Sequence, residues 1–234
     1  AVPIFADISS ETFYLEADSV EKAITKRTKA ILAVNLFGQT ADFGKLLPLA
    51  KKYNLKVIED NAQAAGALWR GRRAGTIGDI GVFSFNVHKT IQAGEGGVLL
   101  TDNSRYALRA QMCRNHGENL AAEYPKAGLL VGSNYRMTEL TAALCEVQLY
   151  RLDILTKKRR ELVARLTKSL KGIDGITVPR VPKGIYHVYY VYPFKIDEKK
   201  LGISRDKLAD AMAAEGYPLS KGYVEPLYLL PIFQ

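Results

Sequence analysis

Short apolar runs alternate with a helical pattern near the start of the chain. Residues 28–36 (TKAILAVNL) and 55–60 (LKVIED) are nearly continuous apolar runs of strand length. Between them, residues 43–53 place leucines on one side and lysines elsewhere, as a surface helix does. Strands that are apolar throughout, rather than alternating, are typical of a parallel sheet covered by helices on both faces. The pattern therefore predicts an α/β domain.

The rest of the chain continues this alternation and then changes character. Further strands are expected at 2–8, 81–85, 97–101 and 187–196, and further helices at 20–24, 104–113, 137–170 and 204–216. Gly172 and Gly175 end the long helix, as glycine commonly does. We place a domain boundary within this helix, so that residues 1–150 form a large α/β domain and residues 151–234 a smaller α+β domain.

Composition limits the classes of protein without selecting one. The chain has 234 residues, of which 33 are Lys or Arg and 24 are Asp or Glu, so its net charge is +9. This charge could attract a phosphate, a nucleic acid or an acidic membrane. No apolar stretch approaches the roughly 20 residues of a membrane-spanning helix. We expect a cytoplasmic protein that binds neither a membrane nor nucleic acid, with Cys113 and Cys145 as buried free thiols.

A basic run, KKRR, occupies residues 157–160 of the predicted long helix. It could be a phosphate or nucleic-acid patch. However, four consecutive helical residues spread around most of the circumference, so they cannot all face one ligand. The run is therefore predicted to be a solvated helix surface.

Chemically distinctive residues concentrate between residues 57 and 97. Asp60 ends one predicted strand, Ser84 closes the next, and Lys89 follows five residues later in a Gly-rich loop. In open α/β sheets, ligands bind beyond the carboxyl ends of the strands. A carboxylate, a hydroxyl and an amine suit a cofactor with a basic ring nitrogen, a phosphate and an aldehyde. Pyridoxal 5'-phosphate has these three features, and its ring acts as an electron sink once a lysine holds the aldehyde as a Schiff base.

Six spaced blocks of the sequence match one family. With these blocks the chain resembles the DegT/DnrJ/EryC1/StrS family of sugar aminotransferases, which have the aspartate aminotransferase fold (fold type I). The resemblance implies a mainly parallel sheet with helices on both faces and a smaller C-terminal domain. It also implies a chain cut at both ends, because the phosphate-binding turn near the family's N-terminus is not identifiable. The blocks are PIFADIS, VNLFGQTAD, VIEDNAQAAGA, GDIGVFSFNVHKTIQAGEGG, NYRMTELTAAL and EPLYLLPIFQ.

The resemblance implies a role for several residues around the cofactor. Lys89 matches the lysine that holds pyridoxal phosphate and moves the proton between the substrate carbon and C4′. Asp60 matches the partner of the pyridinium nitrogen, and Ser84 a ligand of the phosphate. Ala62 would lie against one face of the ring, and Gln63 would approach the ring oxygen or the substrate. Family members with histidine in place of this lysine are dehydratases, but the five-residue interval from Ser84 puts Lys89 at that position.

Further assignments concern the substrate and a second subunit. Asn134 matches a residue that reaches the cofactor phosphate of the neighbouring subunit, which implies a homodimer with shared active sites. His187 and Tyr223 fall near blocks that line the substrate side. Arg136 is expected to contact a substrate phosphate, to cap a helix or to pair with an acid. No second His or Cys stands at metal-binding spacing from a histidine, so no metal site is expected.

The expected reaction is amino transfer in amino-sugar or polysaccharide biosynthesis. The amino donor would be an amino acid, with L-glutamate the leading candidate, and the acceptor a nucleotide-linked keto sugar. Two alternatives stay open at this point. One is a keto-cyclitol as the acceptor, and the other is a regulatory protein that retains the fold without catalysis.

Overall fold

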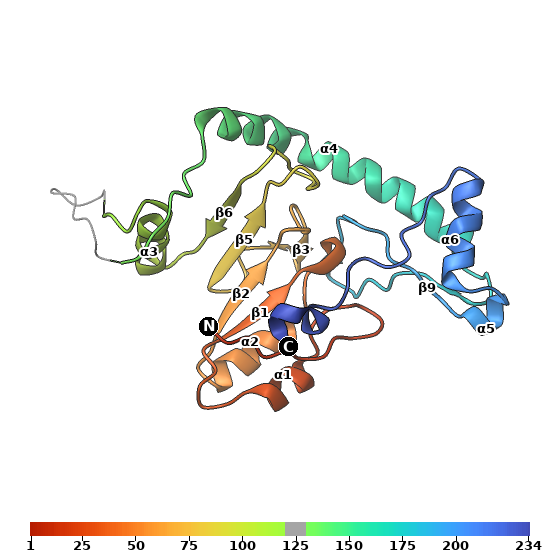
Figure 1. Cartoon of the computed structure of the whole chain (residues 1–234), viewed down its shortest axis with the longest axis horizontal. Helices are drawn as coiled ribbons and strands as arrows, with labels where there is room; N and C mark the ends of the chain where they lie inside the picture. Colours follow the sequence, from red (N-terminus) through yellow and green to blue (C-terminus); the bar gives the residue numbers. More distant parts are fainter. Residues whose placement is uncertain (120–129) are drawn as a thin grey trace.

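A computed structural model describes residues 1–119 and 130–234 of the chain (Figure 1). At its centre lies a four-stranded sheet in the order β1-β2-β5-β6. Strands β1, β2 and β5 are parallel, and β6 runs antiparallel to β5. The predicted mainly parallel sheet is therefore confirmed. The strands are β1 (Ala30–Val34), β2 (Lys56–Asp60), β5 (Ile80–Ser84) and β6 (Gly97–Leu100).

Two helices cover one face of this sheet. Helices α1 (Ala17–Ala23) and α2 (Phe43–Lys52) contribute to a core shared with β1 and β2 (Figure 1). Phe43 and Leu46 of α2 are fully buried there, and burying such side chains stabilises the fold by about 1.5–3 kcal/mol each. The side chains of strand β1 alternate between buried and exposed, because Ile31 and Ala33 face this core whereas Leu32 on the opposite face is 54% exposed.

Helix α4 (Glu139–Leu170) crosses the molecule on the other side of the sheet, from the vicinity of α3 to that of α6 (Figure 1). Its 32 residues follow the N-cap residue Thr138, whose hydroxyl accepts a hydrogen bond from the Thr141 N–H at 3.2 Å. It continues without a break through residue 150, so the division into domains 1–150 and 151–234 stays a prediction. The other helical elements are α3 (Ser104–Arg114), α5 (Glu198–Leu201), α6 (Arg205–Ala214) and the short η1 (Leu36–Gly38), η2 (Leu227–Leu229) and η3 (Pro231–Phe233).

Two strand predictions are wrong. Residues 2–8 contain only an isolated bridge between Ile8 and Leu15. Residues 187–196 are strand only at their end, where β9 (Lys195–Ile196) pairs with β7 (Ile176–Thr177). The reason is that Tyr189 has a positive φ of 50°, which interrupts an extended chain. The remaining short strands are β3 (Leu68–Trp69), β4 (Arg72–Arg73) and β8 (Ile185–Tyr186).

The segment around Tyr189 instead packs on the turn that follows β1. The N–H of Val188 donates to the carbonyl of Gly38 at 2.9 Å. A Cβ atom on Gly38 would lie only 2.8 Å from Cγ2 of Val188, and this glycine has a φ of +95°. A glycine is needed at this position, because any side chain would be both strained and in contact with the neighbouring segment.

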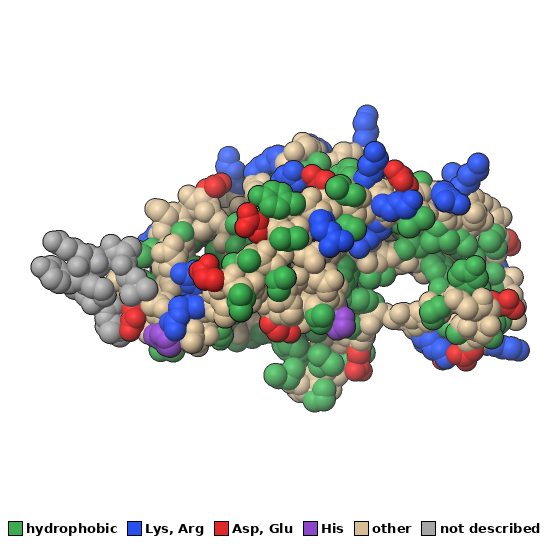
Figure 2. Space-filling model, turned by 90° about the horizontal axis from the view of Figure 1, so that it is seen from above, with side chains coloured by type: hydrophobic (Ala, Val, Ile, Leu, Met, Phe, Trp, Pro, Cys, Tyr) green, Lys and Arg blue, Asp and Glu red, His purple; other side chains and the backbone are tan. Residues whose placement is uncertain are grey.

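Surface properties complete the description. No helix in the described residues is long and apolar enough to cross a membrane. Both cysteines are free, but Cys113 is exposed and Cys145 only half-buried, so the prediction of buried thiols is wrong; in α3 only Met112 is buried. On the face seen in Figure 2, Lys and Arg side chains are interspersed with Asp and Glu rather than gathered in one patch.

Candidate active site

Parallel pairing brings three predicted site residues to one edge of the sheet. Strand β2 ends at Asp60, which is paired in register with Val82 of β5. Ser84 lies two residues further along β5, and Lys89 follows in the next loop, where its N–H donates to the carbonyl of Asn86 at 2.8 Å. This edge holds the carboxyl ends of β2 and β5, which is where open α/β sheets bind ligands.

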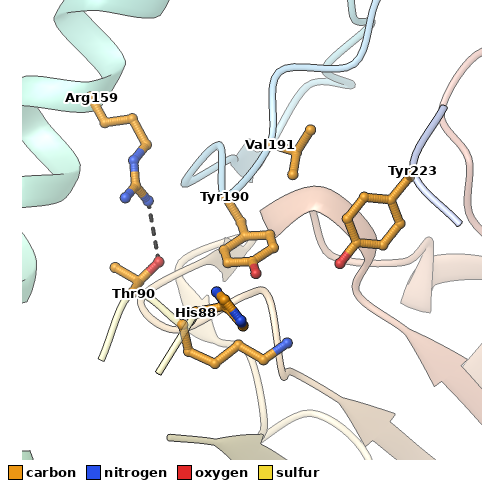
Figure 3. Close-up of a pocket in the computed structure, with 7 residues that line it drawn as sticks. His88, Thr90, Arg159, Tyr190, Val191 and Tyr223 are labelled. Atoms are coloured by element: carbon orange, nitrogen blue, oxygen red, sulfur yellow. Dashed lines mark hydrogen bonds between the residues drawn. The ribbon is translucent and has the colours of Figure 1, made fainter. Parts of the chain in front are cut away.

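A pocket of about 320 Å³ opens beside this loop (Figure 3). The Nζ atom of Lys89 lies 5.3 Å from the centroid of the Tyr190 ring, within the range of a cation–π contact. The volume is near the lower limit of about 300 Å³ for small-molecule sites. Its lining consists of His88, Lys89, Thr90, Arg159, Tyr190, Val191 and Tyr223.

Gln63 connects the strand edge to the C-terminal segment. Its Nε2 donates to the hydroxyl of Tyr223 at 2.6 Å, and its Oε1 accepts from the N–H of Phe37 at 2.7 Å. The Phe37 and Tyr223 rings also meet edge to face, with centroids 5.5 Å apart. Burial raises the pKa of Tyr223 above its ordinary value, so the hydroxyl is protonated at neutral pH. The structure thus places Gln63 and Tyr223 together, with Tyr223 in the pocket wall.

Asp60 and Ser84 have hydrogen-bonding capacity to spare. Oδ1 of the half-buried Asp60 accepts from the N–H of Ala62 at 2.9 Å, and no hydrogen bond reaches its Oδ2 from the described residues. The hydroxyl oxygen of Ser84 accepts from the N–H of Asn86 at 3.3 Å, which leaves its proton available. Asp60, Ala62 and Ser84 are not among the residues that line the pocket, so their predicted roles at a cofactor stay predictions.

A buried carboxylate beneath this edge was not among the predicted site residues. Glu59 is fully buried. Its Oε1 accepts from the N–H groups of Ile77 at 2.6 Å and Gly78 at 2.7 Å, and its Oε2 from that of Gly75 at 2.8 Å. Period-two alternation could have revealed it, since Glu59 follows buried Val57 by two residues and must face the same side of the strand.

Two buried asparagines extend this network to the turn after β2. Nδ2 of Asn35 donates to Oδ1 of Asn61 at 2.6 Å, and Nδ2 of Asn61 donates to the carbonyl of Glu59 at 3.2 Å. Oδ1 of Asn35 accepts from the N–H of Ala41 at 2.7 Å. The Asn35–Glu59–Asn61 network therefore holds the backbone on both sides of Asp60, because buried polar groups keep their partners.

Asn134 and Arg136 lie away from the pocket lining, beside the end of α3. Asn134 is exposed and forms an isolated bridge with Asn115. Nη1 of Arg136 donates to Oδ1 of the buried Asn115 at 2.6 Å. Within residues 1–119 and 130–234, the side-chain partner of Arg136 is thus an amide and not an acid. The predicted roles of both residues at a cofactor or substrate stay predictions.

His187 is buried rather than placed in the pocket wall. It is 2% exposed, stacks on Tyr189 with ring centroids 3.9 Å apart, and accepts a hydrogen bond at Nδ1 from the Tyr189 N–H at 3.0 Å. Burial lowers its pKa to about 3, although a hydrogen bond with the backbone of Gly38 opposes this shift. The nearby guanidinium of Arg160 adds to the lowering. His187 is therefore neutral in the folded protein at ordinary pH.

This neutrality predicts a pH-dependent stability. Below pH 6.5 the unfolded chain binds a proton at His187 that the folded chain does not, so stability is lost as the pH falls from 6.5 towards 3. The loss is about 1.4 kcal/mol per pH unit in this window. Urea unfolding measures the free energy of unfolding at pH 7.5 and at pH 4.5. The decrease between these two pH values should be smaller by about 2–3 kcal/mol in His187→Gln than in the wild type. Equal losses in the two proteins would contradict a buried neutral histidine.

The four side chains of the KKRR run differ in their burial. Lys157 and Lys158 are exposed, whereas Arg159 and Arg160 are half-buried, so the prediction of a wholly solvated surface is wrong for the two arginines. Nη1 of Arg160 donates to the carbonyl of His187 at 2.7 Å, and its guanidinium lies over the Tyr186 ring at 4.0 Å.

Comparison with known proteins identifies the fold. The aminotransferase from Psychrobacter cryohalolentis has a TM-score of 0.92 at 30% identity, and the match covers 100% of this chain and 64% of that protein. S. venezuelae DesV in complex with a ketimine intermediate has a TM-score of 0.89 at 32% identity, covering 99% and 60%. The GDP-perosamine synthase of Caulobacter vibrioides is 35% identical over 235 residues, which are 99% of this chain and 62% of that protein. The fold is that of a type I pyridoxal-phosphate aminotransferase.

The whole of this chain matches one protein family. The chain belongs to the DegT/DnrJ/EryC1/StrS aminotransferase family, whose pattern matches residues 1–234. This family depends on pyridoxal phosphate. The chain spans about three fifths of the length of these relatives.

Proposed function

We propose that the protein transfers an amino group from an amino acid, L-glutamate, to a nucleotide-linked keto sugar. The observation that carries this proposal is the amine of Lys89 in the wall of a pocket at the carboxyl edge of the sheet. The relatives support a sugar acceptor, since they include a GDP-perosamine synthase and DesI, whose structure was determined in the presence of its TDP-sugar product. The two free cysteines support a cytoplasmic location.

The residues at the sheet edge fit pyridoxal phosphate. When bound, this cofactor supplies a ring that withdraws electrons from the substrate carbon. Lys89 would bind its aldehyde and then hold and move a proton, which requires a partly neutral amine. Oδ2 of Asp60 would accept a hydrogen bond from the ring nitrogen, and the Ser84 hydroxyl would donate to the phosphate. Ala62 would lie against the ring, and Gln63 would orient the Tyr223 hydroxyl towards the substrate.

The three substrate assignments differ in their support. Tyr223 lines the pocket and is held by Gln63, so it has the strongest support. His187 lies beneath Tyr189 and would support the wall of the site rather than touch the substrate. Arg136 would act only if a second subunit brought a ligand to it.

We infer that two copies of the chain pair through α4 and share their active sites, with Asn134 reaching the partner's cofactor. One side of the helix carries apolar residues at spacings of three and four, and all are exposed. Leu140 is 81% exposed and Tyr150 76%, and an apolar stripe of this kind indicates an interaction surface. The stripe consists of Leu140, Leu144, Val147, Tyr150 and Ile154.

The proposed reaction can be tested in its two halves. The full-length protein, including any part beyond these 234 residues, should show a visible absorbance band with pyridoxal phosphate that L-glutamate bleaches. The resulting amino form should then recover the band with at least one nucleotide-linked keto sugar. Recovery only with keto-cyclitols would select that alternative. This arm is included because one relative, an aminotransferase of Micromonospora echinospora, is named for a scyllo-inosose substrate. Absence of the band would favour a regulatory protein.

A further inference from the structure

One cation on α4 faces the candidate pocket instead of solvent. Arg159 extends from α4 towards Thr90 (Figure 3), and its Nη1 donates to the Thr90 hydroxyl at 3.2 Å. Arg159 is half-buried and shares the pocket lining with Lys89. The helical period explains its direction, since Arg159 lies three residues after buried Thr156 and four before buried Val163.

The charge of Arg159 has no counter-ion among the residues that the structure describes. None of the ion pairs among the described residues includes Arg159, and its one hydrogen bond is to a neutral hydroxyl. A guanidinium has five N–H donors, so most of them are available. Burial lowers the pKa of Arg159 below its ordinary value, which reflects the free-energy cost of holding an unpaired charge away from water. Arg160 differs, since it is already bonded to the backbone of the His187 segment.

The other groups around the pocket carry no negative charge. The lining contains the amine of Lys89, the imidazole of His88, the phenols of Tyr190 and Tyr223, and the apolar Val191, but no Asp or Glu. A concave site lined by one sign of charge attracts a ligand of the opposite sign. A guanidinium in such a site can bind a carboxylate or a phosphate through two parallel hydrogen bonds.

We propose that Arg159 is a substrate-binding residue that holds an anionic group of a substrate beside Lys89. The identity of the substrates rests on the proposed function. The anionic group is the carboxylate of the amino-acid donor or the diphosphate of the nucleotide-linked sugar, because both present the same oxyanion chemistry. Arg159 would thereby orient one substrate with its reacting carbon towards the Lys89 amine.

The test compares Arg159→Gln and Arg159→Lys with Arg165→Gln, which removes the same charge from an exposed position of the same helix. In the full-length protein with pyridoxal phosphate, all three variants should keep the visible band. In Arg159→Gln, the half-saturating concentration of one substrate should rise about 10- to 100-fold, the loss expected for a charge-assisted hydrogen bond. Arg159→Lys should recover part of this loss, and Arg165→Gln should match the wild type.

The outcomes separate the sources of the anion. A rise confined to L-glutamate identifies the donor carboxylate, and a rise confined to the keto-sugar nucleotide identifies the diphosphate. Unchanged values for both substrates, or a loss of affinity for pyridoxal phosphate alone, would overturn the proposal.

A cofactor-free titration separates this proposal from the proposed function. If the wild type lacks the band or glutamate does not bleach it, the proposed function fails while Arg159 can still be tested. Calorimetry with glutarate and with inorganic pyrophosphate should then show at least about tenfold weaker binding of one of them by Arg159→Gln than by the wild type. Equal binding of both anions by the two proteins would refute a role for Arg159 in anion binding.

Discussion

Replacing Lys89 by alanine is expected to abolish both the visible absorbance band of the protein with pyridoxal phosphate and its amino transfer. The amine of Lys89 is the only lysine nitrogen in the described lining of the pocket. Without it the aldehyde has no nucleophile and the substrate carbon has no positioned base. Turnover should fall by about four orders of magnitude or more, because covalent attachment and proton transfer are both lost. Absorbance spectra and single-turnover rates measure the two effects separately.

Two further variants separate the chemistry of Lys89 from its charge. Lys89→Arg keeps a cation in place but cannot form a Schiff base, so its band should be lost as in the alanine variant. Lys51→Ala removes an exposed lysine of α2 and should leave band and turnover at wild-type levels. If Lys89→Ala retained both signals, the assignment of Lys89 as the cofactor lysine would be wrong.

The second large effect is expected from Glu59→Ala, on stability. This change removes the acceptor of the N–H groups of Gly75, Ile77 and Gly78 and leaves them buried without partners. Each orphaned donor costs about 1–3 kcal/mol, so we expect a total loss of about 3–5 kcal/mol. That is a large part of the 5–15 kcal/mol that stabilises a typical domain. Urea unfolding of the full-length protein measures the loss.

Matched variants make the Glu59 prediction specific. Glu59→Gln keeps one oxygen acceptor and the shape of the side chain, so its loss should be intermediate. Glu161→Ala removes an exposed carboxylate from α4 and should change the free energy of unfolding by less than about 0.5 kcal/mol. Equal stabilities of Glu59→Ala and Glu161→Ala would show that the Asn35–Glu59–Asn61 network contributes little.

Much of the fold could be predicted because its signals are local. The apolar runs at 28–36 and 55–60 became β1 and β2, and the leucine and lysine pattern between them became α2. Where the prediction failed, a contact between distant segments determined the conformation. The apolar run at 187–196 has strand composition, yet Tyr189 adopts a positive φ while its neighbour Val188 bonds to Gly38.

In the candidate site, too, some features could be predicted from the sequence and others depend on contacts between distant segments. The sequence alone determined that Asp60 and Ser84 end neighbouring strands and that Lys89 follows in the next loop, and parallel strands present their carboxyl ends at one edge. Only the tertiary structure decided that Arg159 faces the pocket while Lys158 faces solvent, and that Gln63 bonds Tyr223 across 160 residues of chain. The physical reason is that the local apolar pattern predicts where each strand ends, and the pairing of parallel strands then fixes the backbone positions at that edge. The direction of a side chain on a helix depends on which neighbour packs against it.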